Sequence, residues 1–151
     1  MYQEPSEFEL YEKMIHQQKN ARQQDGYNDF MDAIYYGKFN TVTSMIHKNP
    51  TNINFVSCSG MTPIMLASNM GYHQIVKILL EQDDSNVSSK HSNGETALDI
   101  ASKLGHVKCT NLLIKHSVKT NKLSADQIIY YYTYVRRNGE DELEGHLMVY
   151  E

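Results

Sequence analysis

A glycine returns at one constant interval along this chain, at Gly37, Gly71, Gly105 and Gly139. The neighbours of these glycines recur at the same interval: Thr62 as Thr96, Ile64 as Leu98, Ala67 as Ala101, and Leu79-Leu80 as Leu113-Ile114. We call this spacing the repeat interval. A period of this length is typical of a unit too small to bury its own apolar face, which becomes stable by stacking on neighbours. The spacing therefore predicts an elongated stack of repeats.

The clearest unit begins at Gly60 and has signals for two helices. Thr62 is a good N-cap, and Pro63 suits the first helical position, where its missing N–H costs nothing. Gly71 should end this short helix because glycine adopts the left-handed conformation without strain. A second helix is predicted over residues 72–81, with an apolar face wide enough to contact neighbours on both sides.

Two segments resemble a known repeat signature. Residues 60–67 read Gly-Met-Thr-Pro-Ile-Met-Leu-Ala, and residues 94–101 read Gly-Glu-Thr-Ala-Leu-Asp-Ile-Ala. Both resemble the Thr-Pro-Leu-His-x-Ala signature of ankyrin repeats, whose usual period is about 33 residues. The resemblance implies an all-α solenoid of three to four helix-turn-helix repeats with an N-terminal capping helix. Residues 28–123 are assigned to repeats one to three.

The two ends of the chain depart from the period. Ser6 and Glu9 form a capping-box pattern that predicts a helix over residues 7–24, with its apolar residues in the first half. We expect that half to pack on the first repeat, within a cap of residues 1–27; a partner or dimerisation helix is the alternative. Ser124 with Gln127 predicts another helix to about residue 138. Residues 124–151 form a degenerate fourth repeat or a C-terminal cap, in which Glu140-Asp141-Glu142 would open a further helix.

Composition excludes several classes of function. The net charge of −4 is mild and the charges are mixed along the chain, so no basic face for nucleic acid is expected. There is no apolar run long enough to span a membrane and no signal-peptide pattern at the start. Two cysteines are too few for a disulfide framework, and Cys109 aligns with Ile75 as a buried hydrophobe. These features favour the cytoplasm, with the nucleus as the alternative.

Signatures of catalysis are missing from the sequence. It contains no glycine-rich nucleotide loop and no Gly-x-Ser-x-Gly nucleophile elbow. None of the 7 histidines has a partner at a recognised metal-ligand spacing. By the ankyrin resemblance, His106 is expected to serve in packing and hydrogen bonding. We therefore expect no enzyme activity, no catalytic residues, no metal and no cofactor.

The resemblance also places partner contacts at the turn tips and at the exposed ends of the first helices. Carried over by position, the expected partner-binding residues are Tyr27, Tyr35, Tyr36, Cys58, Ser59, Met61, Asn69, Met70, His91, Ser92, Asn93, Glu95, Lys103, Leu104, Arg136 and Arg137. Several are large residues that the repeat core does not need, which is typical of an interaction surface. The alternative for Tyr35 and Tyr36 is that they fold onto the N-terminal helix.

A second candidate surface is the tyrosine cluster at residues 130–134. Helical geometry predicts that Ile128, Tyr132 and Val135 face inward, while Tyr130, Tyr131 and Tyr134 are partly exposed. The sequence as a whole indicates an adaptor or scaffold module that binds a protein or peptide in a concave groove. The alternatives are a stoichiometric inhibitor of an enzyme or transcription factor, and oligomerisation through the N-terminal helix. The oligomeric state is left between monomer and weak dimer.

Overall fold

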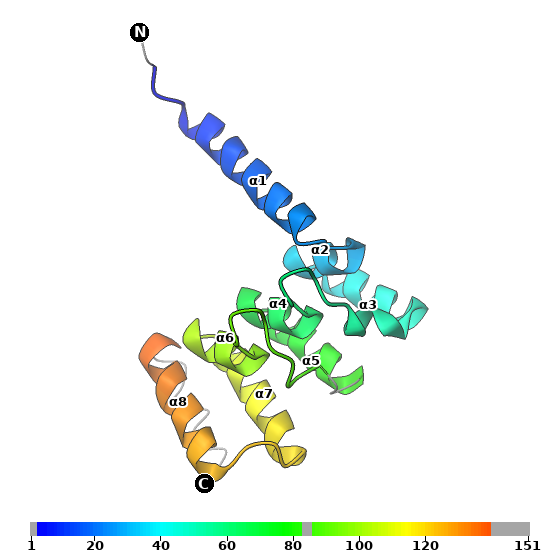
Figure 1. Ribbon diagram of the computed structural model, residues 1–151, viewed down its shortest axis with the longest axis vertical. Coiled ribbons are helices and arrows are strands. Elements are labelled where there is room, and N and C mark those ends of the chain that lie inside the picture. The colour runs from blue at the N-terminus through cyan, green and yellow to red at the C-terminus, as the bar shows by residue number, and fades with distance from the viewer. Residues whose placement is uncertain (1–2, 83–85, 140–151) are drawn as a thin grey trace.

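The computed structural model describes residues 3–82 and 86–139, and the regular structure in these ranges is helical (Figure 1). The elements are α1 (Glu7–Gln24), α2 (Asp29–Tyr35), α3 (Phe39–Lys48), the short 3₁₀ helix η1 (Pro50–Asn54), α4 (Pro63–Met70), α5 (His73–Gln82), α6 (Ala97–Lys103), α7 (Val107–Lys119) and α8 (Ala125–Gly139). Helices α2, α4, α6 and α8 pack side by side in one layer, and α3, α5 and α7 form a second layer behind them. The predicted all-α solenoid is confirmed.

Each first helix begins at a polar side chain that caps it. Thr62 Oγ1 accepts a hydrogen bond from the Met65 amide at 3.3 Å, and Thr96 Oγ1 accepts one from the Asp99 amide at 3.2 Å. Asn28 does the same for the first repeat, from the Met31 amide at 2.9 Å. These bonds satisfy amides that a helix start would otherwise leave unpaired. The predicted helix starts are therefore confirmed, and Asn28 replaces the threonine in repeat one.

The recurring glycines make room for a ring from the next repeat. The Tyr72 ring lies against Gly37 and its hydroxyl donates to the carbonyl oxygen of Tyr35 at 3.2 Å. One repeat later, the His106 ring lies against Gly71 and Nε2 donates to the carbonyl oxygen of Asn69 at 3.0 Å. Both glycines have positive φ, 67° and 74°. A side chain at either position would be strained and would meet the ring, so the recurring glycine is required by stacking as well as by helix termination.

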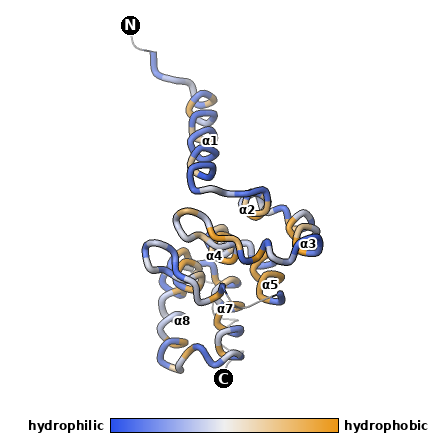
Figure 2. The backbone as a smooth tube through the Cα atoms, turned by 45° about the vertical axis from the view of Figure 1, so that its right-hand side comes forward, coloured by the Kyte–Doolittle hydropathy of each residue, from blue (hydrophilic) through white to orange (hydrophobic). Residues whose placement is uncertain are grey.

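The core runs continuously between the two layers of helices. Its fully buried members include Met31 from repeat one, Met65 and Ile75 from repeat two, and Leu113 from repeat three. Figure 2 shows hydrophobic residues along α4 and α5 in the middle of the stack, whereas most of α1 is hydrophilic. Cys109 is 1% exposed, as predicted, and burial raises the pKa of its thiol to about 12. It has no disulfide to Cys58, which is exposed and also free.

Helix α1 begins at the predicted capping box, in which the Ser6 amide donates to Glu9 Oε2 (2.8 Å) and the Glu9 amide donates to Ser6 Oγ (3.2 Å). The expectation that its first half packs on repeat one is wrong. The helix leaves the end of the stack and projects away from it (Figure 1), and the apolar side chains of its first half are exposed. The contacts of α1 with repeat one come from its later turns, through the hydrogen bonds of Gln18 with Tyr35 and of Arg22 with Asp32 and Tyr36.

Helix α8 occupies the place of a first helix in a fourth repeat. It begins at the predicted capping box, with the Ser124 amide donating to Gln127 Oε1 at 2.9 Å. Tyr132 and Val135 are buried against the stack, and the Tyr132 hydroxyl donates to Asn111 Oδ1 at 3.0 Å. The predicted division of the tyrosine cluster is confirmed, because Tyr130 is exposed and Tyr131 and Tyr134 are half-buried. The further helix expected from residue 140 lies outside the described residues.

Candidate protein-binding groove

Three turns carry a glycine at equivalent positions of the repeat; the first follows the end of α1, and the other two link successive repeats. Their tips are Asp25-Gly26, Ser59-Gly60 and Asn93-Gly94, again separated by the repeat interval. The glycines have φ values of 78°, 87° and 87°, in the left-handed region that favours glycine. The three turns therefore share one glycine conformation at one repeat interval, although the first is formed by the end of α1.

Hydrogen bonds join each tip to the next. The Asp25 carboxylate accepts three of them, from the Ser59 amide (2.6 Å), the Ser59 hydroxyl (2.7 Å) and the Ser57 hydroxyl (2.8 Å). The Ser59 carbonyl oxygen accepts from the Ser92 amide at 2.9 Å. Bonds from repeat to repeat hold the tips in fixed positions, so a partner would meet a surface that is already ordered.

Two neighbouring hollows lie between these tips and the layer formed by α2, α4, α6 and α8, and we call them together the concave groove. The first, of about 190 Å³, lies between repeats two and three and is lined by Met61, Asn69, His91, Asn93, Glu95, Ile100, Lys103 and Leu104. The second, of about 280 Å³, lies between α6 and α8 and is lined by Glu95, Asp99, Ser102, Lys103, Tyr130 and Tyr134. Because both hollows share Glu95 and Lys103, they form one continuous surface.

An ion pair stands where the two hollows meet. Lys103 Nζ lies 3.4 Å from Glu95 Oε1, which also accepts from the Asn93 side-chain amide at 3.0 Å. The Lys103 side chain is 58% exposed, so water screens this pair and its contribution to stability is on the order of 0–1 kcal/mol. A partner can therefore form an ion pair with Lys103 or Glu95 and break this one at little energetic cost.

The wall on the α8 side is fixed by a bond between two helices. The Tyr131 hydroxyl donates to Asp99 Oδ1 at 2.8 Å, while Asp99 Oδ2 accepts from the Thr96 amide and hydroxyl. Burial and the hydrogen bond to Asp99 raise the pKa of Tyr131 well above its ordinary value. Tyr130 and Tyr134 are left stacked at the groove, with ring centroids 5.8 Å apart.

Most of the partner-binding residues predicted in repeats two and three come together in this groove. Seven of them line the first hollow: Met61, Asn69, His91, Asn93, Glu95, Lys103 and Leu104. Cys58, Ser59 and Ser92 lie at the turn tips, and Met70 is half-buried against the core. Arg136 and Arg137 are exposed on the last turns of α8 and line neither hollow.

The residues predicted in repeat one lie elsewhere. Tyr35 donates its hydroxyl to Gln18 at 2.9 Å, and the Tyr36 hydroxyl accepts from Arg22 at 2.8 Å. The Arg22 guanidinium also lies 4.0 Å from the centre of the Tyr35 ring. Tyr35 and Tyr36 therefore contact the N-terminal helix, as the alternative expected, although Tyr36 remains 56% exposed. Tyr27 is half-buried beside them, and burial with the nearby Asp25 charge raises its pKa to about 12.

Sequence reasoning missed Arg22, Asp25 and Asp99. The positions of Asp25 and Asp99 within the repeat gave a weak signal of their roles. Asp25-Gly26 stands one repeat interval before Ser59-Gly60, which marks it as a turn tip. Asp99 stands one repeat interval after the buried Met65, so a carboxylate replaces an apolar side chain at that place. Arg22 makes its contacts across a turn, with Asp32 and Tyr36, and local periodicity carries no signal for it.

The chemistry available in the groove is that of recognition. Apolar surface from Met61, Ile100 and Leu104 alternates with amide, carboxylate and ammonium groups. Over residues 3–82 and 86–139, no group of three or more His, Cys, Asp or Glu residues is arranged to hold a metal ion. Within those same ranges, no helix is long and apolar enough to cross a membrane.

Comparison with known proteins agrees with this architecture. A family model for ankyrin repeats, in three copies, matches residues 30–124, which is more than half of the chain. No curated protein matches the chain in a sequence comparison. The matched segment begins in α2 and ends just before α8, so it contains all three helix pairs of the stack. The chain therefore belongs to the ankyrin-repeat family.

Proposed function

We propose that this chain is an adaptor or scaffold module that binds a partner protein through the concave groove. Ankyrin repeats are generally protein–protein interaction modules. The observation that carries the proposal is that seven residues from two repeats, each expected from its position in the repeat to contact a partner, line one hollow. Their side chains line a surface rather than the core, so they are placed to contact a partner.

The groove favours an extended segment of the partner. Its first hollow offers apolar side chains, Met61 and Leu104, and its second offers the stacked rings of Tyr130 and Tyr134. Tyrosine is enriched among the residues that dominate binding energy. A segment with an apolar side chain at one end and a flat or cationic group at the other would fit both hollows, with Lys103 and Glu95 between them.

The mechanism is display of a fixed surface. The tips are joined by hydrogen bonds and α8 is held by the Tyr131–Asp99 bond, so little conformational entropy is lost when a partner binds. The free, exposed thiol of Cys58 supports the proposal that the protein functions in a reducing compartment, the cytoplasm or the nucleus.

Affinity capture from a lysate, with partners identified by mass spectrometry, tests the proposal. The groove variant is Lys103→Glu/Leu104→Ala. The matched control is Lys108→Glu/Val118→Ala, which makes comparable changes at exposed positions of α7, in the second layer of helices. Both should keep the circular dichroism spectrum of the wild type. We expect the control to retain the partner and the groove variant to lose it.

A partner that both variants retain equally would remove the groove from the proposal. If the captured partner is an enzyme or transcription factor, adding the purified chain at equal concentration separates the two remaining roles. An adaptor leaves the partner's activity unchanged, whereas a stoichiometric inhibitor abolishes it.

A further inference from the structure

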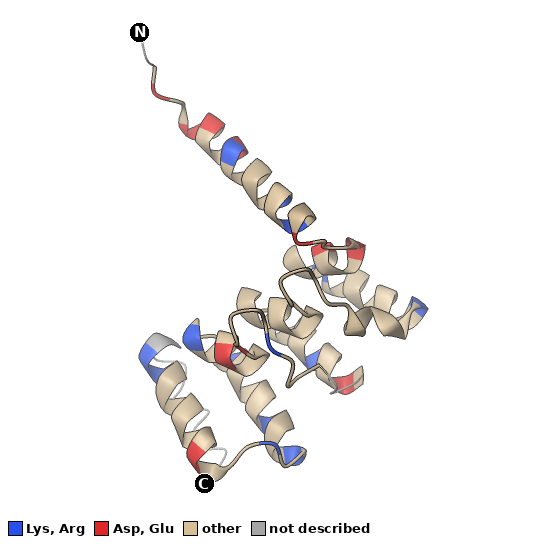
Figure 3. Cartoon of the chain, in the orientation of Figure 1, with Lys and Arg blue, Asp and Glu red and all other residues tan. Residues whose placement is uncertain are grey.

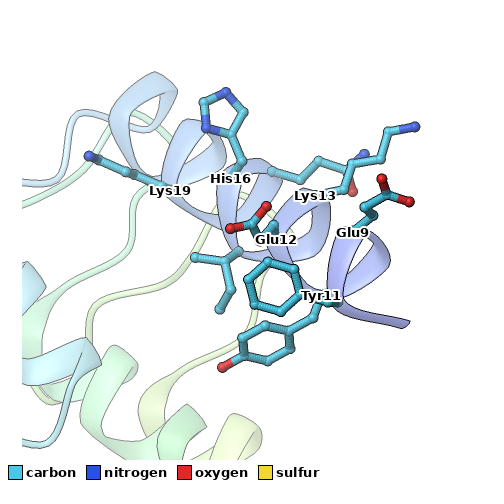
Figure 4. Close-up of a pocket in the computed structure, with 9 residues that line it drawn as sticks. Glu9, Tyr11, Glu12, Lys13, His16 and Lys19 are labelled. Carbon is cyan, nitrogen blue, oxygen red and sulfur yellow. The ribbon is translucent and has the colours of Figure 1, made fainter. Parts of the chain in front are cut away.

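Helix α1 carries an apolar face that nothing in the described chain covers. Its members are exposed by 68%, 52%, 59%, 45% and 43%, in the order Phe8, Leu10, Tyr11, Met14 and Ile15. Their spacing of three and four residues places them along one side of the helix. Figure 4 shows Tyr11 projecting from one side of α1 and His16 from the other. The hollow along this helix, about 860 Å³, is lined by α1 residues alone, so it is open and encloses no small molecule.

The size of this face suits a weak interface between two helices. Phe8 and Tyr11 can each bury about 150–250 Å² when fully covered. Together with the three aliphatic side chains, all about half exposed, the face offers on the order of 500 Å² per copy. Two such faces together give on the order of 1,000 Å², at the low end for protein–protein complexes. An apolar patch of this size on a projecting helix marks an interaction site.

The charges along α1 change sign after residue 12. Glu7, Glu9 and Glu12 come first, and the basic residues Lys13, Lys19 and Arg22 follow toward the end (Figure 3). Two parallel copies would place like charges level with each other. Two antiparallel copies would place the acidic half of each helix beside the basic half of the other, which is the favourable arrangement for side chains and helix dipoles alike.

We propose that α1 pairs with α1 of a second copy of this chain, antiparallel, through this apolar face. A crossing point between residues 12 and 13 sets Leu10 opposite Ile15 and Tyr11 opposite Met14 of the other copy. The same alignment sets Glu12 level with Lys13 of the other copy, whereas His16, like Glu9, lies on the side of α1 away from the apolar face. The apolar contacts therefore select this alignment, and the opposite charges of Glu12 and Lys13 are compatible with it.

The shape of the molecule permits this pairing. The repeats are attached at the C-terminal end of α1, and the helix projects away from them (Figure 1). In an antiparallel pair the two repeat stacks lie at opposite ends of the helix pair and do not collide. The concave groove of each copy stays free, so the dimer would present two copies of the groove and raise the avidity for a partner with two sites.

Sedimentation velocity of the full chain, from about 1 to 500 μM, tests the pairing because a weak dimer responds to concentration. The test variant is Tyr11→Glu/Ile15→Glu. The matched control is His16→Glu/Asn20→Glu, which adds the same two charges at the same spacing on the opposite side of α1. All four positions are exposed, so the fold should survive, and circular dichroism checks this. We expect the wild type and the control to dimerise, and the test variant to remain monomeric throughout.

Charge reversal supplies a second, independent readout. Glu9→Lys/Glu12→Lys makes α1 basic, and Lys13→Glu/Lys19→Glu makes it acidic. Each variant alone should dimerise at least tenfold more weakly than the wild type, and an equimolar mixture should recover the dimer. A wild type that is monomeric at the highest concentration, as it would be if α1 binds a different protein, overturns the proposal. Equal dimerisation of the test variant and the control, or no recovery in the mixture, overturns it as well.

Discussion

Replacing Gly71 by alanine tests whether the glycine period exists because of packing between repeats. Gly71 ends α4 with φ of 74°, and a Cβ placed there would lie 2.7 Å from Nδ1 of the His106 ring. That ring would have to move, and its hydrogen bond to the Asn69 carbonyl would be lost with it. Gly94 is the matched control, because its φ is 87° and a Cβ there meets nothing within 4 Å.

The two substitutions should differ by the cost of the displaced ring. Left-handed backbone costs an L-residue roughly 1–2 kcal/mol, which applies to both positions. The lost His106 hydrogen bond adds about 1 kcal/mol at Gly71 alone. We therefore expect Gly71→Ala to lower the free energy of unfolding by about 2–3 kcal/mol, and Gly94→Ala by about 1–2 kcal/mol.

Urea unfolding followed by circular dichroism at 25 °C measures both changes. A double-mutant cycle with His106→Ala then isolates the contact, because without the ring the Gly71 substitution retains only its backbone cost. The coupling between the two substitutions should be about 1 kcal/mol. Equal costs for Gly71→Ala and Gly94→Ala, or a cost at Gly71 that His106→Ala leaves unchanged, would refute the packing explanation of the period.

Three further predictions concern single side chains. The native protein should react with one equivalent of a thiol reagent at neutral pH, through exposed Cys58, and with two equivalents in denaturant, because burial raises the pKa of Cys109 to about 12; two native thiols reacting at equal rates would contradict this. The pKa of an unfolded tyrosine is 10.0, whereas burial and the Asp25 charge raise the pKa of Tyr27 in the folded protein to about 12. Between these pH values the unfolded state binds fewer protons than the folded state, so the free energy of unfolding falls as the pH rises. Tyr27→Phe should make that fall shallower, as measured by urea unfolding between these pH values, and an unchanged slope would argue against it. Arg22→Ala removes the contacts of α1 with Asp32 and Tyr36 and should speed amide hydrogen exchange in residues 7–24, whereas Lys19→Ala should not; equal exchange in both variants would show that Arg22 does not hold the helix.

Local signals allowed the sequence to predict the helices. A capping box joins residues three apart, so Ser6 with Glu9 and Ser124 with Gln127 located two helix starts outside the clear repeats. Gly71 located the end of α4 for a similar reason, since its conformation depends on the residue itself. Elements of this kind need no knowledge of the fold.

The candidate groove could be predicted in part because the period maps equivalent positions onto one edge. Met61, His91 and Lys103 were found in this way and line one hollow. In repeat one, Tyr35 and Tyr36 contact Arg22 and line neither hollow, so positional transfer did not locate the groove there. Repeat one is the end of the stack, and its surface depends on a helix that the period does not describe.

The sequence alone determined the repeat, its helix boundaries and the stacking, because each depends on interactions that recur within one unit or between adjacent units. The tertiary structure decided which surfaces remain exposed. It joined Asp99 to Tyr131 on a neighbouring helix and directed α1 away from the stack with Tyr11 uncovered. Apolar periodicity identifies a face that can be buried, but the partner that buries it depends on where the helix axis points, and contacts distant in sequence set that direction.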